Sequence, residues 1–467
     1  MRKVVIVLLL AGVIFACNQM QGDDISSPPS DLGSRPIKFC NSGTADMLCP
    51  VLPIDVDTTF GVGYDSFLDS ILQPPFDQFS WQTFVALNWP ADVSGKPVGK
   101  NIGDFPNYPR VWEFYKEPAE VFGYGSQELT TQLGIAKQDG SKFLYMDSKS
   151  PQAILPFQGF READGHPLID RNLNFTMYEI KMNPTEVNFV TTYKLTTKDS
   201  IVAYWKRNYK SFDLPQSDSA TNNPGSMEIK ASWRILDPAK GDDTSRYYCR
   251  NALIYIDSAH TVNKKALYLR AKVGLVGMHI IRKTAKFGSM MIWSTFEHVD
   301  NTPDSPQEAQ MNPKKKWSYY NPLCLNCLPN DTPAFQKGDD KRYRWDSTPP
   351  YGKRYAVRAP SQPALGLFGT QAVRTYPVYT YTALMSNAWQ AKLKGTVWAN
   401  YKLVGSQWQS GETIPAPNAP ALLANTTLET FIQPTASCIT CHGDAKLISG
   451  KDTVRTDLSF VFAFYPK

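Results

Sequence analysis

In the stretch "SMEIKASWRIL", residues 226–236, apolar and polar side chains alternate from Ser226 to Ile235. Side chains of a β-strand point to opposite faces in turn, so a period of two indicates a strand with one buried face. The apolar positions are Met227, Ile229, Ala231, Trp233 and Ile235. The polar positions are Glu228, Lys230, Ser232 and Arg234. The stretch therefore predicts a half-buried strand.

Four neighbouring segments are also rich in β-branched and aromatic residues, which favour strands. They are "NFVTTYKLTT" (188–197), "YYCRNALIYI" (247–256), "KALYLRAKVGLVGMHIIRK" (265–283) and "SMMIWSTFEHV" (289–299). Because no regular alternation of strands with helices accompanies them, we expect a mostly antiparallel sheet between about 170 and 300.

Helices are expected outside this sheet. In "FDQFSWQTFVALNWP", Trp81, Phe84 and Val85 have helical spacing, and Pro90 ends the run. A second helix is expected within 380–394, followed by a strand in "TVWANYKLVGSQW", and a third, short helix at Thr426, where Glu429 completes a capping box. The predicted fold class is α+β: a mainly antiparallel β body with peripheral helices and a separate C-terminal segment.

The N-terminus predicts export. Arg2 and Lys3 precede an apolar run over 4–15, and Ala16 is the small residue expected before a cleavage site. Since Cys17 follows directly, "IFAC" resembles a bacterial lipobox, which implies acylation of Cys17. In that resemblance, Asn18 favours anchoring at the outer membrane of a Gram-negative cell, in the periplasm or at the cell surface. The alternative is an ordinary secretory signal with a cysteine there by chance.

The composition of the chain suits a folded protein, and local changes in sequence suggest its segment boundaries. Hydrophobic residues make up 42% of it and aromatic residues 12%, which suits a packed core, and the net charge of +6 over 467 residues gives no nucleic-acid signature. We expect a signal peptide over 1–16, a tether over 17–50, a β-rich body over 51–410 and a separate C-terminal segment over 411–467. A proline-rich excursion should interrupt the body at about 301–363, where ten prolines fall.

Cysteine spacing predicts disulfides in an exported protein. Cys40 and Cys49 can close a short loop, and Cys324 and Cys327 are expected to pair as a structural disulfide rather than as a redox or zinc site. Cys249 is then left without a partner among the remaining cysteines.

The strongest signal for function is "CITCH", Cys438 to His442. This is the attachment signature of c-type haem. Two thiols add across the two vinyl groups on one edge of the porphyrin, and the adjoining imidazole ligates the iron. We therefore expect one covalent haem c at Cys438 and Cys441, with His442 as an axial ligand of the iron. The C-terminal segment over 411–467 is then a c-type haem-binding segment of the α+β fold. The alternatives are a disulfide beside a bystander histidine and half of a zinc site.

The position of the motif restricts the pocket. Only 25 residues follow His442, and none of them is Met or His. The β-rich body must therefore supply the far wall of the pocket and any sixth ligand. The candidates are His298, which lies in a polar cluster at a strand end, and His279 and Met278 in an apolar strand.

Two resemblances accompany these residues. "CITCH" followed by "DLSFVFAFYP" (457–466) resembles the end of the P-four-sixty cytochromes over about forty residues. This resemblance implies a β-rich haem pocket with an open distal side, and oxidation of hydroxylamine or binding of nitric oxide. That family's domain is much smaller, and its lysine cross-link has no counterpart assigned here. The phrases "WQTFVALNWP", "WSTFEHVDN" and "SCITCH" resemble large bacterial cytochrome c family proteins, which imply no particular activity.

Three functions follow as expectations. The first is an exported, lipid-anchored mono-haem cytochrome that transfers electrons to or from a redox partner protein or small molecule. The second is a haem enzyme or sensor with an open distal site for peroxide, hydroxylamine or nitrogen oxides. The third is a partner- or glycan-binding protein with a structural haem.

Overall fold

The computed structural model describes residues 37–42, 46–57, 68–149, 159–286, 291–335, 339–409 and 418–467. The predicted signal peptide, Cys17 and most of the tether lie outside the described residues. Within the described part, no helix is both long enough and apolar enough to cross a bilayer.

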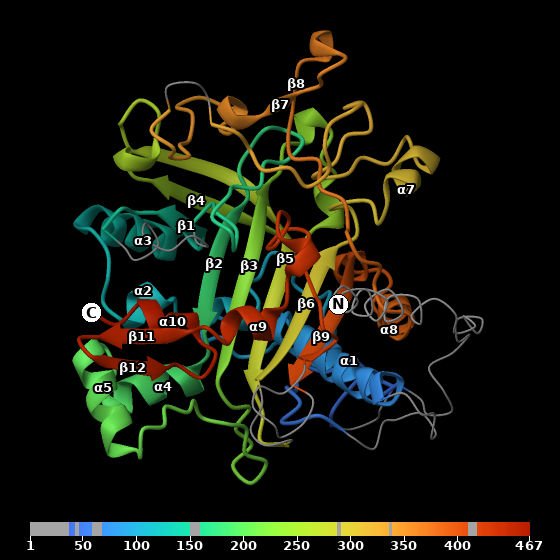
Figure 1. Cartoon of the computed structure of the whole chain (residues 1–467). Helices are drawn as coiled ribbons and strands as arrows, with labels where there is room; N and C mark the ends of the chain where they lie inside the picture. The colour runs from blue at the N-terminus through green and yellow to red at the C-terminus, as the bar shows by residue number, and fades with distance from the viewer. Residues whose placement is uncertain are drawn as a thin grey trace, which may run out of the picture.

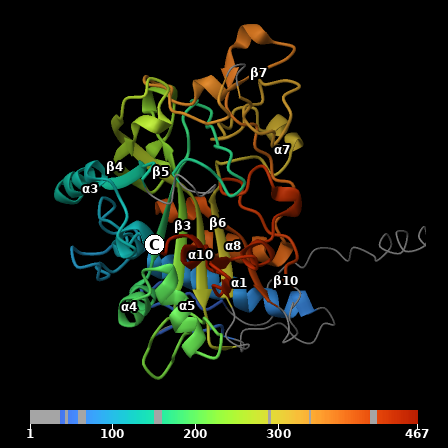
Figure 2. The ribbon, with the colours of Figure 1, turned by 60° about the vertical axis from the view of Figure 1, so that its left-hand side comes forward.

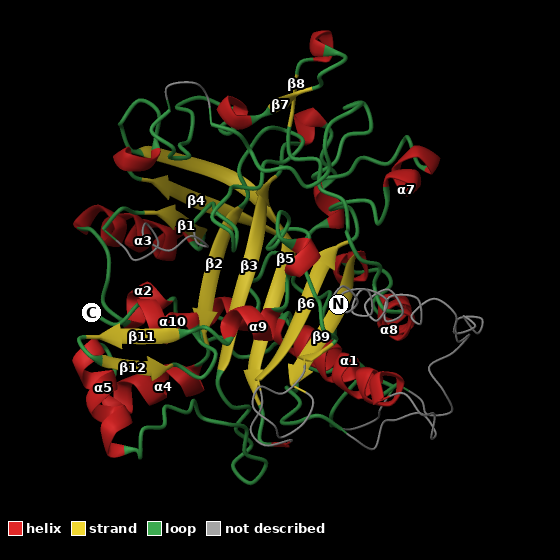
Figure 3. Cartoon of the chain, viewed as in Figure 1, coloured by secondary structure: helices red, strands yellow, loops and turns green. Residues whose placement is uncertain are grey.

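The protein has an α+β fold built on one mixed sheet of eight strands (Figures 1 and 3). Among the described residues, seven strand pairings form this sheet. Six of them are antiparallel, and the pairing of β1 with β4 is parallel. The strands are β1 Lys142–Met146, β2 Met177–Met182, β3 Met227–Ile235, β4 Cys249–Ile256, β5 Leu267–Lys283, β6 Met291–His298, β9 Tyr401–Gln409 and β10 Asn418–Ala419. The expected antiparallel strands at 226–236, 247–256, 265–283 and 289–299 are thus confirmed in their described residues.

Strand β5 organises the sheet because it has two different neighbours along one edge. Its first half, Leu267 to Gly274, pairs with β4, and its second half, Gly277 to Lys283, pairs with β6, which in turn pairs with β9. Along its other edge, β5 pairs with β3 from Val273 to Arg282. The first edge therefore divides at the middle of β5 into a branch of β4 and β1 and a branch of β6, β9 and β10, while β3 and β2 lie on the opposite edge.

Helices α1 (Leu68–Leu87) and α8 (Thr380–Lys392) pack against each other and against one face of this sheet. Trp81 of α1 stacks on Trp389 of α8 with ring centroids 5.6 Å apart, and Phe84 stacks on Phe296 of β6 at 4.1 Å. Both helices were expected from the sequence.

The opposite face of the sheet is covered by the C-terminal segment and by helices at its edge. The segment comprises α9 (Cys438–His442), the hairpin β11 (Lys446–Ser449) and β12 (Asp452–Arg455), and α10 (Phe460–Phe464). Val461 and Phe462 of α10 belong to the same buried cluster as Trp293 of β6. Figure 1 shows this segment in red, with α9 in front of β3 and β5 and with β11, β12 and α10 to the left, near the lower end of β2.

The remaining helices are peripheral: α2 Pro118–Val121, α3 Gln127–Asp139, α4 Pro184–Tyr193, α5 Lys198–Arg207 and α7 Pro306–Met311. Short 3-10 turns lie at Val111–Phe114, Pro238–Lys240, Thr244–Arg246, Ser258–His260, Lys353–Tyr355, Pro363–Leu365, Val397–Asn400 and Gln433–Thr435. The proline-rich stretch after Asn301 holds little else than α7 and the small hairpin of β7 (Val357–Arg358) and β8 (Leu367–Phe368). Figure 2 shows β7 and α7 at the end of the molecule opposite α4 and α5.

Two predicted elements are wrong. The expected strand at 188–197 is mostly helix α4, because Asn183 caps the helix through a hydrogen bond from the Glu186 backbone N–H and Pro184 occupies its first turn. The expected helix at Thr426 is a turn. The Glu429 carboxylate accepts a hydrogen bond from Asn425 N, and the Thr426 hydroxyl donates to Glu297 on β6, so neither side chain caps a helix.

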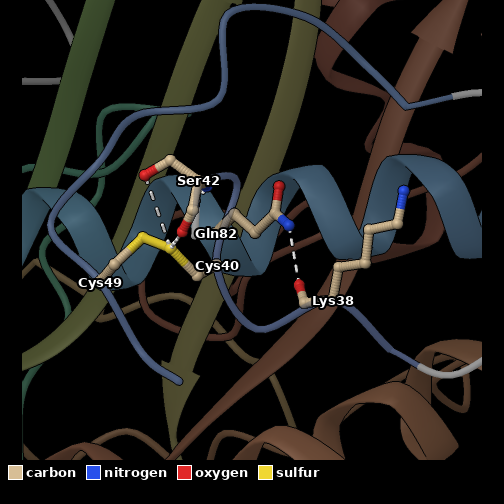
Figure 4. The surroundings of a disulfide bond; sticks show 5 residues. All are labelled: Lys38, Cys40, Ser42, Cys49 and Gln82. Carbon is tan, nitrogen blue, oxygen red and sulfur yellow. Dashed lines mark hydrogen bonds between the residues drawn. A yellow bond between two sulfur atoms is a disulfide. The ribbon is translucent and has the colours of Figure 1, made fainter. Parts of the chain in front are cut away.

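Both predicted disulfides are present, one joining Cys40 to Cys49 and one joining Cys324 to Cys327. Figure 4 shows the first of them beside helix α1, where the Gln82 amide donates to the backbone carbonyl of Lys38 at 2.7 Å. Cys249 is a free thiol, as expected.

Candidate functional site

The cysteine–histidine motif forms the short helix α9, which is fixed to the face of the sheet by Gln407 of β9. The Gln407 side chain accepts a hydrogen bond from the backbone N–H of Ile439 at 3.0 Å and contacts the Ser437 hydroxyl at 3.2 Å. Ile439 is buried in the core beneath the helix. One strand residue and one apolar side chain therefore set the position of all three residues of the motif.

The imidazole of His442 is held by a single polar contact and two aromatic rings. Its Nδ1 lies 2.7 Å from the carbonyl oxygen of Leu458, and the ring lies 5.1 Å from Trp293 and 4.8 Å from Phe460, measured between centroids. A carbonyl oxygen only accepts, so Nδ1 carries the proton and Nε2 keeps its lone pair. Loss of water around the ring lowers the pKa of His442 to about 4, which keeps it neutral at pH 7. This is the state in which histidine ligates a metal.

The thiols of Cys438 and Cys441 are not joined to each other. Burial raises the pKa of both thiols, so both are protonated at neutral pH. Cys438 is half-buried and Cys441 is exposed, and both line the same cavity as His442.

That cavity has a volume of about 560 Å³ and lies between the C-terminal segment and the sheet. Its volume falls within the range of about 300–1,000 Å³ that is usual for ligand and cofactor sites. Most of its wall is apolar, and the apolar side chains include Ile180, Ile229, Ile281, Trp293, Leu423, Ile432, Phe460, Val461 and Phe464.

A few polar side chains interrupt this wall on strands β3 and β5. His279 of β5 pairs with Glu429, its Nε2 lying 2.9 Å and 3.1 Å from the two carboxylate oxygens. Among the described residues, no group forms a hydrogen bond with the buried Nδ1 atom of His279. Lys230 and Glu228 of β3 line the cavity as well. Although burial opposes it, the charge of His279 lowers the pKa of Glu429.

The turn that carries Glu429 sits directly on the sheet. A Cβ atom at Gly277 of β5 would lie 2.2 Å from the Thr427 hydroxyl, so glycine is needed there for the turn to approach. The buried carboxylate of Glu297 accepts hydrogen bonds from the backbone N–H and the hydroxyl of Thr426, at 2.6 and 2.9 Å. Arg374 completes this anchor, with Nη2 at 2.5 Å from Glu297.

Of the three candidates for a distal group, His279 lies at the cavity and the other two do not line it. Met278 points to the opposite face of the sheet, where it packs in the core with α1 and contacts the Asn88 amide. His298 is fully engaged at its strand end: Nε2 contacts the Arg246 carbonyl at 3.0 Å, and Nδ1 accepts from Asp300 N at 3.1 Å. Its ring also stacks on Tyr247.

Three cavity residues, Glu228, Lys230 and Glu429, were not predicted from the sequence as site residues. Glu228 and Lys230 belong to the polar side of a strand that was expected to face solvent. The C-terminal segment covers this side instead, so Glu228 is buried and Lys230 half-buried. The charged residues of this strand, which lies at the centre of the predicted sheet, could have indicated that its polar side lines a site.

Among the described residues, no group of three or more His, Cys, Asp or Glu side chains is arranged to hold a bare metal ion. Comparisons of the chain with protein-family models, with curated proteins and with solved structures found no match. The proposals below therefore depend on the residues of this chain alone.

Proposed function

We propose that the protein is a mono-haem c-type cytochrome with a redox role, in which Cys438 and Cys441 attach the haem and His442 is an axial ligand of the iron. The observation that carries the proposal is the arrangement of His442. Its Nδ1 is occupied by the Leu458 carbonyl at 2.7 Å, which leaves Nε2 as the ligating atom, and it lines a cavity of about 560 Å³ together with both thiols. An orienting hydrogen bond at the other ring nitrogen is usual for histidines that bind metals.

The residues present fit a haem. Two thiols that form no disulfide are separated by two residues in the chain and lie beside a neutral imidazole, and most of the cavity wall is apolar, as a porphyrin requires. When bound, a haem c would supply one-electron redox chemistry at its iron. The chain would fix the ring orientation of His442 and exclude water with Trp293, Phe460 and the apolar wall. The attachment residue Cys441 is exposed, so this side of the site would be accessible to a redox partner.

Export and lipid anchoring belong to the same proposal. The N-terminal pattern and Cys17 support them, because c-type haem is attached after translocation and a covalent link keeps the cofactor from being lost outside the cell. The partner would then be a redox protein or a small oxidant or reductant that meets the anchored protein at the cell envelope.

One observation favours a second candidate, a haem enzyme or sensor with an open distal site. The pair of His279 and Glu429 lines the cavity together with Lys230, although a plain electron carrier needs no ionisable groups there. Such groups can donate or accept protons for a small substrate such as peroxide, hydroxylamine or a nitrogen oxide. Of these groups, His279 would act as the general acid or base, because histidine takes this role most often.

The test is to produce the full chain in a bacterial host with a cytochrome c maturation system. We expect a Soret band, an intact mass increased by one haem, and haem staining that survives denaturation. A colourless protein of unmodified mass would contradict the proposal. Optical spectra with and without carbon monoxide then separate the two candidates: prompt CO binding supports the open site, and a low-spin spectrum indifferent to CO supports the carrier.

A further inference from the structure

Two buried glutamates meet at the edge of the cavity, and the proposed function does not use either of them. Glu228 of β3 lines the cavity, and Glu186 of α4 is fully buried behind it. Within the described part of the chain, neither carboxyl oxygen of Glu186 receives a hydrogen bond of ordinary geometry from a donor group. An uncompensated buried carboxylate is costly, so a carboxyl group in this place binds a proton instead.

The two carboxyl groups differ in protonation because their neighbours differ. Burial and the adjacent carboxyl of Glu228 raise the pKa of Glu186 well above its usual range, so Glu186 stays protonated. Burial also raises the pKa of Glu228, to about 7, while hydrogen bonds from the Ser459 hydroxyl and from Glu186 limit the rise. Because the Ser459 hydroxyl donates to Glu228 and no donor group in the described residues bonds to Glu186, Glu228 is the member of the pair that ionises more readily.

Titratable groups from α4, the C-terminal segment, β3 and β5 surround Glu228. Glu186 approaches from α4, and Asp457 of the C-terminal segment approaches with its partner Lys283 at the end of β5, 2.8 Å away. Along β3 and β5, Lys230 and the pair of His279 and Glu429 line the same cavity. Lys283 is already neutralised by Asp457, and it therefore does not serve as a counter-ion for Glu228.

We propose that the Glu186–Glu228 pair is a proton-binding site linked to the redox state of the cavity's cofactor. The inference depends on the proposed function. A haem in the cavity would supply one-electron chemistry. With one more electron in the cavity, the Glu228 carboxylate would take up one proton from solvent and become a carboxylic acid, and it would release that proton when the electron leaves. One electron and one proton enter together, so the charge of the cavity is unchanged. Glu186 is the positioning residue, which stays protonated and donates to Glu228.

The experiment is a potentiometric titration of the haem-loaded protein between pH 5 and 9. We expect the midpoint potential to fall as the pH rises above about 7, with a slope approaching 59 mV per pH unit, which is the equivalent of a tenfold change in proton concentration for one electron. Glu228→Gln should flatten this slope. Glu186→Gln should keep it, because an amide still donates to Glu228. Asp331→Asn, an exposed carboxylate in a loop, is the matched control and should also keep it.

A second readout needs no variant. Infrared difference spectra of the wild-type protein, recorded between the oxidised and reduced states with ¹³C-labelled glutamate, should show a glutamic acid carbonyl band that appears on reduction. A haem protein whose slope is the same with and without Glu228, or whose infrared difference lacks that band, would overturn the inference and leave the proposed function standing. A protein that carries no haem would overturn both.

Discussion

The imidazole Nδ1 of His442 and the carbonyl oxygen of Leu458 are joined by a hydrogen bond of 2.7 Å. The carbonyl is aimed at the ring by an unusual backbone, since Asp457 and Leu458 have φ values of +51° and +65°. Two consecutive residues other than glycine in the left-handed region are strained and persist only where other contacts hold them. Asp457 supplies those contacts: its carboxylate accepts from Lys283 and from Leu214 N, each at 2.8 Å.

The first prediction concerns this turn. Asp457→Asn should release it, because an amide cannot neutralise Lys283, and the orientation of His442 should become looser. Loss of such outer contacts typically costs 10–100-fold in metal affinity. In the haem-loaded protein, we therefore expect exogenous imidazole to displace His442 at about a tenfold lower concentration, measured by optical titration. Asp452→Asn, which removes a surface ion pair with Lys206, should leave the titration unchanged.

The second prediction assigns the attachment to two particular thiols. Cys438→Ala and Cys441→Ala should each leave one thioether, and the double variant should carry no covalent haem, as read by intact mass. Cys249→Ala is the control, because Cys249 is a free thiol that does not line the cavity. Covalent haem in the double variant, or its loss in the Cys249 variant, would contradict the assignment.

The third prediction distinguishes His279 from His298, which the sequence offers equally as candidates for the distal group. His279→Gln removes a side chain from the cavity wall and should change the rate of CO binding or the midpoint potential of the haem protein. His298→Gln should leave both unchanged and should instead lower stability. Its two buried hydrogen bonds, to Arg246 and Asp300, lie outside the cavity, and leaving their partners unsatisfied costs about 1–3 kcal/mol. Urea denaturation and flash photolysis of the two variants would show the opposite pattern if His298 were the distal residue.

The periodic parts of the fold could be predicted from the sequence, and the covering of its faces could not. The alternation over 226–236 placed β3, because side chains of one strand obey a local rule. The same alternation assigned Glu228 to the solvent side, although Ser459, 231 residues further on, covers it and donates to it. No local pattern reports on such a distant contact. The motif at Cys438 was recognisable because its chemistry is contained in five consecutive residues.

The helix at 184–193 was missed for another reason. Its interior is rich in β-branched residues, which favour strands weakly, whereas the cap at Asn183 and Pro184 specifies a helix start. At the turn near Thr426, a capping pattern predicted a helix that does not form. The capping pattern was present, but Glu297 of β6 bonded Thr426 and His279 bonded Glu429, so tertiary contacts replaced the local ones.

The fourth prediction concerns the anchor of that turn. Glu297→Gln would remove one of the two carboxylates that pair with the buried Arg374 in the described residues, leaving the partly exposed Asp304, and would weaken the bonds to Thr426. Breaking a buried ion pair costs about 3–5 kcal/mol. Because Asp304 remains, we expect about 3 kcal/mol less stability in urea denaturation. Asp304→Asn is the comparison variant and should cost less, since Glu297 stays in place. Equal losses for the two variants would show that Glu297 is not the main anchor.

The fifth prediction is a pH dependence that arises far from the motif. Asp77 of α1 is fully buried and accepts hydrogen bonds from Gln73, Thr382 and Ser406, at 2.6–2.7 Å. Burial raises its pKa from 3.8 to about 6, and the three hydrogen bonds only partly offset this. The folded protein therefore binds a proton at Asp77 more tightly than the unfolded chain does. The stability from this proton is complete below about pH 4 and is lost as the pH rises through about 6.

Between pH 7 and pH 5, Asp77 should thus add about 1.3 kcal/mol to the free energy of unfolding, from the linkage relation with these two pKa values. Asp77→Asn cannot bind this proton, and Asn also cannot accept every one of the three hydrogen bonds, so the variant should be less stable at both pH values. The informative quantity is the difference between wild type and variant, because other carboxyl groups titrate equally in both. That difference should be larger at pH 5 than at pH 7 by about 1.3 kcal/mol in urea denaturation. A difference independent of pH would mean that Asp77 is ionised throughout, and its burial would then have to be compensated by charges that the present hydrogen bonds do not supply.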